Sequence, residues 1–338
     1  MPRATSLPTL AQIARIAGVS VPTASRVVNG RENVAPETRL RVEEAVRRAG
    51  YVRRPQSAPS GPVPLVDVVL PGFGSGWSGE VLRGAEEAAA ESGLGIVVSS
   101  WLRDRAGRLD RLAAHGTAAV LFAGTRLNPT QHLWLSRRRI PYAVLEPGVE
   151  PPLGVPVVGA DNRSGGRAAT EHLLSLGHRR IAVLGGHRGT PSSNARINGY
   201  HQALASAWIR PRPEYVRHTG FGPDRAERLV EELLDLPEPP TALFLTSDEM
   251  AFAVLRAAGR RGLRVPDDLS VVGFDDIPDA RRLVPGLTTV HQPIAEMAAT
   301  ALRTLVRLLH GLHVDDTRTD LPTRLVVRGS TAPPPPEP

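Results

Sequence analysis

The chain has no cysteine among its 338 residues, which excludes disulfides, thiolate metal sites and cysteine catalysis. It has no lysine either, so all 41 basic residues are arginine. No apolar run reaches the roughly 18 residues that a membrane span needs, and no signal peptide precedes the first predicted helix. These absences favour a cytoplasmic protein, and we expect no cofactor and no metal ion.

The segment from Thr9 to Gly30 predicts a helix-turn-helix. Thr9 is a good N-cap, and Gly18 is able to adopt the left-handed conformation that ends a helix. Between them, four apolar residues repeat at helical spacing: Leu10, Ile13, Ala14 and Ala17. We therefore expect a two-turn helix with one buried stripe.

A second short helix follows, capped by Ser20 and tolerant of Pro22 because first-turn N–H groups have no helical partner. Its buried side is predicted to consist of Ala24, Val27 and Val28. Its outward side is predicted to carry Pro22, Arg26 and Asn29. A helix with a packed back and an outward amino-terminal half has the shape that enters a DNA major groove.

A third helix is expected from Pro36, with Val42, Ala45, Val46 and Ala49 as its apolar stripe and Gly50 as its end. Three helices alone also fit a small docking domain. The charge favours DNA, because residues 1–56 hold ten arginines and four glutamates, a net of +6. The whole chain is +7, so the remaining residues contribute only +1.

Residues 52–64 contain four prolines with serine and glycine and no apolar periodicity, which indicates a linker. Beyond it, short apolar runs alternate with amphipathic patterns. The predicted strands are Leu65–Leu70, Gly95–Ser99, Ala118–Ala123, Tyr142–Leu145, Ile181–Gly185, Ala242–Thr246 and Ser270–Phe274. The predicted helices are Gly79–Ser92, Gly165–Leu176, Asn198–Ser206, Arg225–Leu234 and Glu249–Arg261. Such alternation is typical of parallel α/β sheets, and about 260 residues suffice for two subdomains with a ligand cleft between them.

The sequence resembles the lactose/galactose repressor (LacI/GalR) family of bacterial transcription regulators. Besides the helix-turn-helix and Thr38–Tyr51, the resemblance rests on four stretches: Glu80–Gly93, Ala160–Gly186, Arg196–Leu204 and Gly262–Pro293. It runs from Thr9 to about Ser330. Several long, ordered matches of this kind are highly specific.

The resemblance implies an all-α helix-turn-helix headpiece (1–51), a hinge (52–64) and a core of doubly wound parallel sheets like that of periplasmic sugar-binding proteins (65–330). It implies an N-subdomain of about 65–160 and 291–320, and a C-subdomain of about 161–290 and 321–330, with crossovers near Ala160, His291 and Leu321. It further implies a homodimeric repressor on a palindromic DNA operator, with a small-molecule effector in the cleft. The proline-rich tail (331–338) is expected to be disordered and has no leucine heptad for tetramerisation.

The resemblance also assigns DNA contacts. Arg26 matches the family's second-helix arginine, which is able to reach guanine or a phosphate. Val21 and Pro22 match the base-choosing pair and offer only van der Waals contacts. The other expected contacts are Thr9, Ser20, Thr23, Ser25 and Asn29; as caps and surface residues, Ser20, Thr23 and Ser25 also have a purely structural interpretation.

The hinge departs from the family pattern. Ser60 stands where a leucine that wedges into the minor groove is usual, and Pro59 would break a helix there. Arg53 and Arg54 are expected to bind the minor groove or phosphates instead. We therefore predict only weak operator bending.

In the core, the resemblance places seven residues around the cleft: Trp77, Glu146, Arg196, Phe221, Ser247, Asp275 and Gln292. Their chemistry suits a sugar-like effector, whose apolar face the aromatic rings cover and whose hydroxyls the charged groups bind. Core packing is the alternative role for Trp77 and Phe221, and Asp248 is expected to cap the helix at Glu249. Ser247 replaces a usual asparagine, and glycines at 72, 74 and 76 replace polar residues, which predicts a wider pocket.

Two other classes remain open at this point. The segment PGFGSGWSG after the first core strand hints at a dinucleotide-binding enzyme, but Trp77 stands where the third glycine of that motif belongs. A free solute-binding protein would share the core but lack the headpiece. The absence of nucleophile-elbow and metalloprotease motifs also indicates that the protein is not an enzyme.

Overall fold

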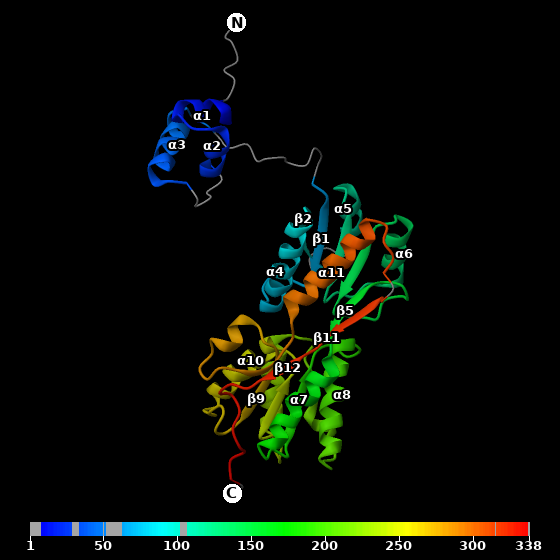
Figure 1. Ribbon diagram of the computed structural model, residues 1–338. Coiled ribbons are helices and arrows are strands. Elements are labelled where there is room, and N and C mark those ends of the chain that lie inside the picture. The colour runs from blue at the N-terminus through cyan, green and yellow to red at the C-terminus, as the bar shows by residue number, and fades with distance from the viewer. Residues whose placement is uncertain are drawn as a thin grey trace. The chain divides into compact units, whose positions relative to one another are not determined.

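The computed structural model describes residues 8–28, 34–49, 51, 63–101, 107–314 and 316–336. The chain divides into two units, Met1–Pro62 and Val63–Pro338, shown in Figure 1. Three of the predicted DNA contacts, Asn29, Arg53 and Arg54, lie outside the described residues, as does the hinge segment 52–62.

The first unit contains three helices, α1 (Leu10–Ala17), α2 (Val21–Val28) and α3 (Pro36–Ala49). Thr9 caps α1 in a capping box with Gln12, and Gly18 ends the helix with φ +63°. The Ser20 hydroxyl accepts a bond from the backbone N–H of Thr23 in the first turn of α2. The predicted caps are thus confirmed.

Small aliphatic residues form the core of this unit. Ile13 and Ala14 of α1, Ala24 of α2 and Val42 of α3 are almost completely buried. Val19, in the turn between α1 and α2, and Tyr51, after α3, pack against this cluster. Because the buried residues follow the predicted stripes, each helix presents its opposite side to solvent.

The second unit contains two six-stranded sheets. The first has the order β11-β5-β4-β3-β1-β2, and its strand pairs are all parallel. The strands are β1 (Leu65–Leu70), β2 (Gly95–Ser100), β3 (Ala119–Ala123), β4 (Tyr142–Leu145), β5 (Val157–Ala160) and β11 (Arg318–Leu321). The second sheet has the order β12-β10-β9-β8-β6-β7, and only its edge pair, β12 with β10, is antiparallel. These strands are β6 (Ile181–Gly185), β7 (Val216–His218), β8 (Ala242–Leu245), β9 (Ser270–Asp275), β10 (Thr288–His291) and β12 (Arg324–Val326).

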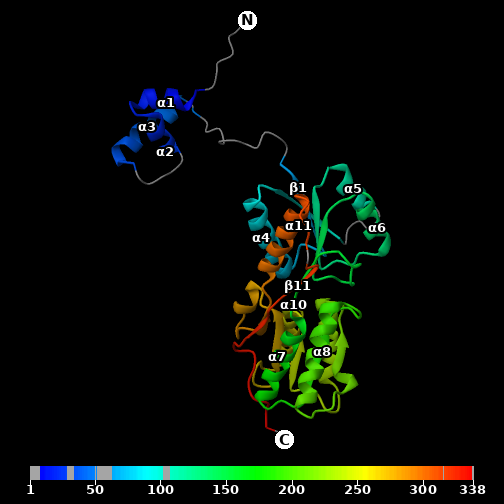
Figure 2. The same ribbon diagram turned by 45° about the vertical axis from the view of Figure 1, so that its right-hand side comes forward.

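Helices cover both faces of each sheet. In the first sheet, Val68 and Leu121 face the cluster with α4 (Gly76–Glu91) and α11 (Ile294–Leu309), whereas Val69 and Phe122 face the cluster with α5 (Arg108–Ala114) and α6 (Pro129–Arg137). This alternation is the period-2 pattern of a strand buried on both faces. Figure 2 shows α4 and α11 side by side. In the second sheet, α7 (Asn162–Ser175) and α8 (Pro191–Ser206) cover one face, and α9 (Pro223–Leu234) and α10 (Asp248–Arg260) cover the other.

The chain passes between the two sheets three times. The strand β5 leads into α7 after Ala160, β10 leads into α11 after His291, and β11 leads into β12 after Leu321. Two short 3-10 helices lie next to strands of the second sheet: η1 (Pro213–Tyr215) precedes β7, and η2 (Pro278–Arg281) follows β9. The doubly wound two-sheet core expected from the sequence is therefore confirmed.

The first residues of the C-terminal tail are hydrogen-bonded to the core, whereas the sequence predicted disorder. His172 contacts the Thr331 hydroxyl at 2.9 Å, and the buried His178 contacts the Ala332 carbonyl at 2.8 Å. The Ala332 N–H donates to Ser270. Composition alone could not predict these bonds because their partners come from distant strands and helices.

Among the helices that the structure describes, we find no candidate for a membrane span, since each is too short or too polar.

Candidate DNA-contacting face and effector site

The outward side of α2 presents the residues expected at DNA. Val21, Pro22 and Arg26 are exposed, whereas Ala24 and Val27 on the opposite side are buried. Because the buried side fixes the helix against α1 and α3, its exposed side is held as a rigid surface. Such a surface suits insertion into a major groove.

The hydroxyl-bearing candidates of this unit already have local hydrogen bonds. Thr9 is engaged in the capping box of α1, and Ser20 lies 2.8 Å from the Thr23 hydroxyl. Thr9 and Ser20 are exposed, and Thr23 and Ser25 are partly buried. These bonds order the amino-terminal turns of α1 and α2.

The buried Arg196 of α8 is the centre of the candidate effector site. Its Nε donates to the Asn162 side chain at 2.7 Å, one terminal nitrogen donates to the Thr246 carbonyl at 2.6 Å, and the other donates to Gln292 at 2.8 Å. Its guanidinium also lies 3.5 Å from the Asp275 carboxylate and stacks 3.7 Å from the centre of the Phe274 ring. Protein groups therefore satisfy all three nitrogens of this arginine.

Glu146 extends this network to the first sheet. Its carboxylate accepts bonds from the Ala160 N–H at 2.9 Å and from the Asn162 amide at 3.0 Å. Asn162 thus links Glu146 at the end of β4 to Arg196 on α8. Four of the predicted effector residues, Glu146, Arg196, Asp275 and Gln292, belong to one connected cluster at the carboxyl ends of the strands, where ligands of parallel sheets bind.

Backbone strain concentrates at these strand ends. Glu146, Phe221, Asp275 and Asp276 all have positive φ angles, at 44°, 61°, 115° and 56°. Non-glycine residues rarely adopt such angles, and proteins tend to keep them where function requires a particular side-chain direction.

Asp248 has a different role from the one predicted. Ser247, not Asp248, caps α10, because its hydroxyl accepts the Met250 N–H. The Asp248 carboxylate instead accepts bonds from the Ile277 N–H at 2.9 Å and the Thr289 hydroxyl at 2.5 Å. Burial raises the pKa of Asp248 to about 7. Burial also raises the pKa of Asp275, although the nearby Arg196 opposes this shift.

The aromatic candidates lie apart from the polar cluster. The Trp77 ring is partly buried and packs beside Gly124 and the core cluster of the first sheet. The Phe221 ring covers the backbone of Gly186, at which any Cβ would lie 2.1 Å from the ring. Both residues therefore have packing roles, the alternative that the sequence left open. Ser247 is nearly buried, as expected of a cap.

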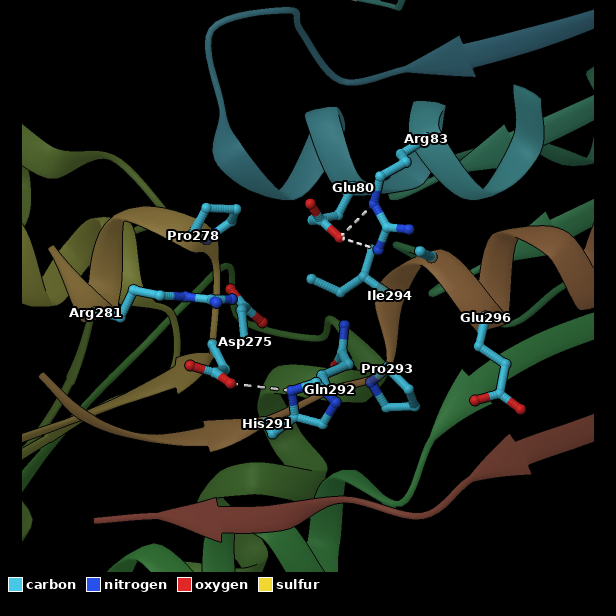
Figure 3. Close-up of a pocket in the computed structure, with 12 residues that line it drawn as sticks. Glu80, Arg83, Asp275, Pro278, Arg281, His291, Gln292, Pro293, Ile294 and Glu296 are labelled. Carbon is cyan, nitrogen blue, oxygen red and sulfur yellow. Dashed lines mark hydrogen bonds and ion pairs between the residues drawn. The ribbon is translucent and has the colours of Figure 1, made fainter. Parts of the chain in front are cut away.

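Two cavities of about 390 Å³ flank the Arg196 network. Figure 3 shows the first, into which Asp275 and Gln292 point between α4 and the crossover from β10 to α11. The amide nitrogen of Gln292 is buried there without a hydrogen-bond partner among the described residues. The second cavity is lined by Glu146, Asn162, Ser192 and Arg318, among others. Neither Trp77 nor Phe221 is among the described residues that line these two cavities.

Several of the residues that build the site were not predicted from the sequence. Asn162 bridges Glu146 and Arg196, and Asp276 contacts both Arg328 and His291. A signal for Asn162 existed, because it lies two residues after β5 at a carboxyl end of the sheet. The stacking of Phe274 under Arg196 had no such signal.

A helix-turn-helix unit joined to a two-sheet core with a polar cluster at its strand ends defines a DNA-binding regulator with a ligand-binding core. Residues 9–54 match the model of bacterial regulatory proteins of the lacI family, and residues 170–331 match that of the periplasmic binding protein-like domain. The chain is 32% identical over 328 residues to the transcriptional repressor CytR of Escherichia coli strain K12, covering 96% of each protein.

Two solved structures of regulators resemble the fold. The complex of the transcriptional regulator CelR with cellobiose is 32% identical, with a TM-score of 0.70, covering 96% of this chain and 99% of that one. The lac repressor dimer bound to operator and an anti-inducer is 27% identical, with a TM-score of 0.69, covering 97% and 100%. The chain belongs to the LacI family of bacterial transcription regulators, and the enzyme alternative is discarded because its relatives are regulators.

Proposed function

We propose that this regulator is a repressor that binds a palindromic operator as a homodimer in the cytoplasm. The exposed side of α2, with Val21, Pro22 and Arg26, would read bases in the major groove, while Thr9, Ser20, Thr23, Ser25 and Asn29 would contact the backbone. The lac repressor dimer on its operator supports the two-fold arrangement. Arg53 and Arg54 would add minor-groove or phosphate contacts from the hinge.

The proposed effector is a small polyhydroxylated molecule bound where the two sheets meet. The buried cluster of Glu146, Arg196, Asp275 and Gln292 carries this proposal, because it offers both donors and acceptors to hydroxyl groups. The cellobiose complex of CelR supports a sugar. Trp77, Phe221 and Ser247 remain proposed contacts for a ligand-bound arrangement in which their packing has changed.

An Arg196 variant would not report on effector binding alone. Because Arg196 joins four protein groups, Arg196→Ala removes both a proposed ligand contact and the internal bonds. Asp275→Asn is the sharper change, since it keeps the shape of the side chain and replaces one carboxyl oxygen by an amide nitrogen. We expect it to weaken effector binding while operator binding without effector stays intact.

Operator affinity measured by fluorescence anisotropy, with and without sugars, tests this function. The panel would contain cellobiose, monosaccharides, nucleobases and phosphorylated sugars, and calorimetry would give the affinity of each. A ligand shifts operator affinity only by its differential affinity for the two core arrangements. A nucleobase or phosphate effector would refute the sugar assignment, and unaltered binding of the identified effector by both Asp275→Asn and Gln292→Ala would refute the pocket.

A further inference from the structure

Glu249 joins the two subdomains on the side of the core where α4 meets α10. Its carboxylate accepts a hydrogen bond of 3.1 Å from the backbone N–H of Gly76, the first residue of α4. The Ser75 hydroxyl caps α4 by accepting a bond of 3.0 Å from the Ser78 N–H. In Figures 1 and 2 the end of α4 that carries this contact faces the second sheet.

The contact satisfies a donor that the helix itself leaves unpaired. The first N–H groups of a helix have no internal acceptor, and the helix dipole favours a negative group at this end. Ser75 accepts the N–H of Ser78, which leaves the Gly76 N–H to the opposite subdomain. Glu249 also lies in the first turn of α10, so two helix amino termini face one carboxylate.

An apolar contact lies beside this hydrogen bond. Ile277, between β9 and η2, is 1% exposed and packs into the core cluster of the first sheet. A Cβ added at Gly76 would lie 2.8 Å from the end of the Ile277 side chain. Phe252 of α10 packs against the core clusters of both sheets. The space that the sequence analysis assigned to a wider pocket at Gly76 is therefore filled by the opposite subdomain.

We propose that Gly76, Glu249 and Ile277 form a latch that joins the two subdomains and fixes the first turn of α4. Glu249 is then a positioning residue for Trp77, which follows Gly76 directly. The inference rests on the proposed function only in that an effector would act on the arrangement that the latch joins. A ligand that prefers the joined subdomains gains from the latch, and one that separates them must break it.

Hydrogen–deuterium exchange of the ligand-free, full-length protein tests the latch. In Glu249→Ala, amides in the first turn of α4 should exchange about three- to tenfold faster, the range expected for losing one hydrogen bond. Glu249→Gln should retain slow exchange, because its amide oxygen still accepts. Peptides from the middle of α4 should not change in either variant, which separates loss of the latch from general loosening of the helix. Glu232→Ala, at an exposed glutamate of α9, is the matched control.

Exchange in Glu249→Ala no faster than in the control would overturn the proposal, as would equally fast exchange in Glu249→Gln. Because neither DNA nor effector is present, these outcomes are independent of whether the proposed repressor function holds.

A cross-link provides a second test that does not use Glu249. The Cβ positions of residues 76 and 277 lie 3.2 Å apart when a Cβ is built on Gly76, a little below the roughly 3.5–4.5 Å usual in disulfides. The chain has no native cysteine, so Gly76→Cys with Ile277→Cys has one possible intramolecular pairing. We expect rapid disulfide formation on mild oxidation without ligand. The control pair is Gly76→Cys with Gly259→Cys, which places the second cysteine at an exposed site on α10. Cross-linking of residues 76 and 277 that is no faster than in this control would contradict the latch.

Discussion

Arg26 of the headpiece and Arg196 of the core carry the same guanidinium group in opposite surroundings. Arg26 is exposed on α2, whereas Arg196 is 4% exposed and donates to Asn162, Thr246 and Gln292. The exposed arginine keeps its donors for a partner outside the protein. The buried one organises neighbouring strand ends, so its removal should affect the fold before it affects a ligand.

The largest expected effect follows from removing the buried arginine. Arg196→Ala should lower the free energy of unfolding of the core by about 3–5 kcal/mol, because it leaves buried polar groups without their cationic partner. All four tryptophans lie in the second unit, so their fluorescence during urea unfolding reports on the core alone. Arg228→Ala, at an exposed position of α9, is the control and should change stability little. A loss for Arg196→Ala that is no larger than this control would show that the network is not structural.

The corresponding change in the headpiece should leave stability unchanged and weaken DNA binding. Arg26→Ala should cost about 1–3 kcal/mol on the operator and relax one base position. Arg41→Ala, at an exposed arginine of α3, should leave base selectivity unchanged. Equal losses on operator and random DNA would instead place Arg26 among the phosphate contacts.

The arginine-rich headpiece also predicts a steep fall of operator affinity with salt, measured as log affinity against log salt concentration.

A pH-dependent effect concerns the buried carboxyl beside the network. Burial raises the pKa of Asp248 from an ordinary 3.8 to about 7, so the folded core binds this proton more tightly than the unfolded chain. The resulting stabilisation is fully present below the ordinary pKa and is lost as pH rises toward 7. Between these limits the stability of the wild type should fall by about 1 kcal/mol per pH unit more than that of Asp248→Asn. Urea unfolding of both proteins at several pH values measures this difference, and parallel pH curves would contradict the assignment.

The smallest expected effect lies in the hinge. With Pro59 and Ser60 in place of a leucine-bearing helix, operator bending in circular-permutation mobility assays should be weak. A strong central kink that disappears when residues 57–60 are altered would refute this interpretation.

The fold was largely predictable because its signals are local. The stripe of Ile13 and Ala14, the cap at Thr9 and the apolar runs such as Leu65–Leu70 all act over a few residues, and the structure confirms them. Short edge strands such as β7, β11 and β12 were missed because their patterns are too short and too polar to be distinguished from loops.

The interior of the site was less predictable because its partners are distant in sequence. Gly76 and Glu249 are 173 positions apart, and Arg196 and Gln292 are 96 apart. The misassigned cap at Asp248 has the same cause, since its acceptor groups are taken by Ile277 and Thr289. Family resemblance predicts which side chains lie at the cleft, but which of them bond to one another depends on packing.

Selection of bound duplexes from a random DNA pool by the purified full-length protein is the most direct test of the proposed repressor. Two copies of α2 presenting Val21, Pro22 and Arg26 predict enrichment of one motif with two-fold symmetry. The Arg26→Ala variant should lose preference at a symmetric pair of positions in that motif. Recovery of no common motif, or of a motif unaffected by Arg26→Ala, would contradict base reading through this helix.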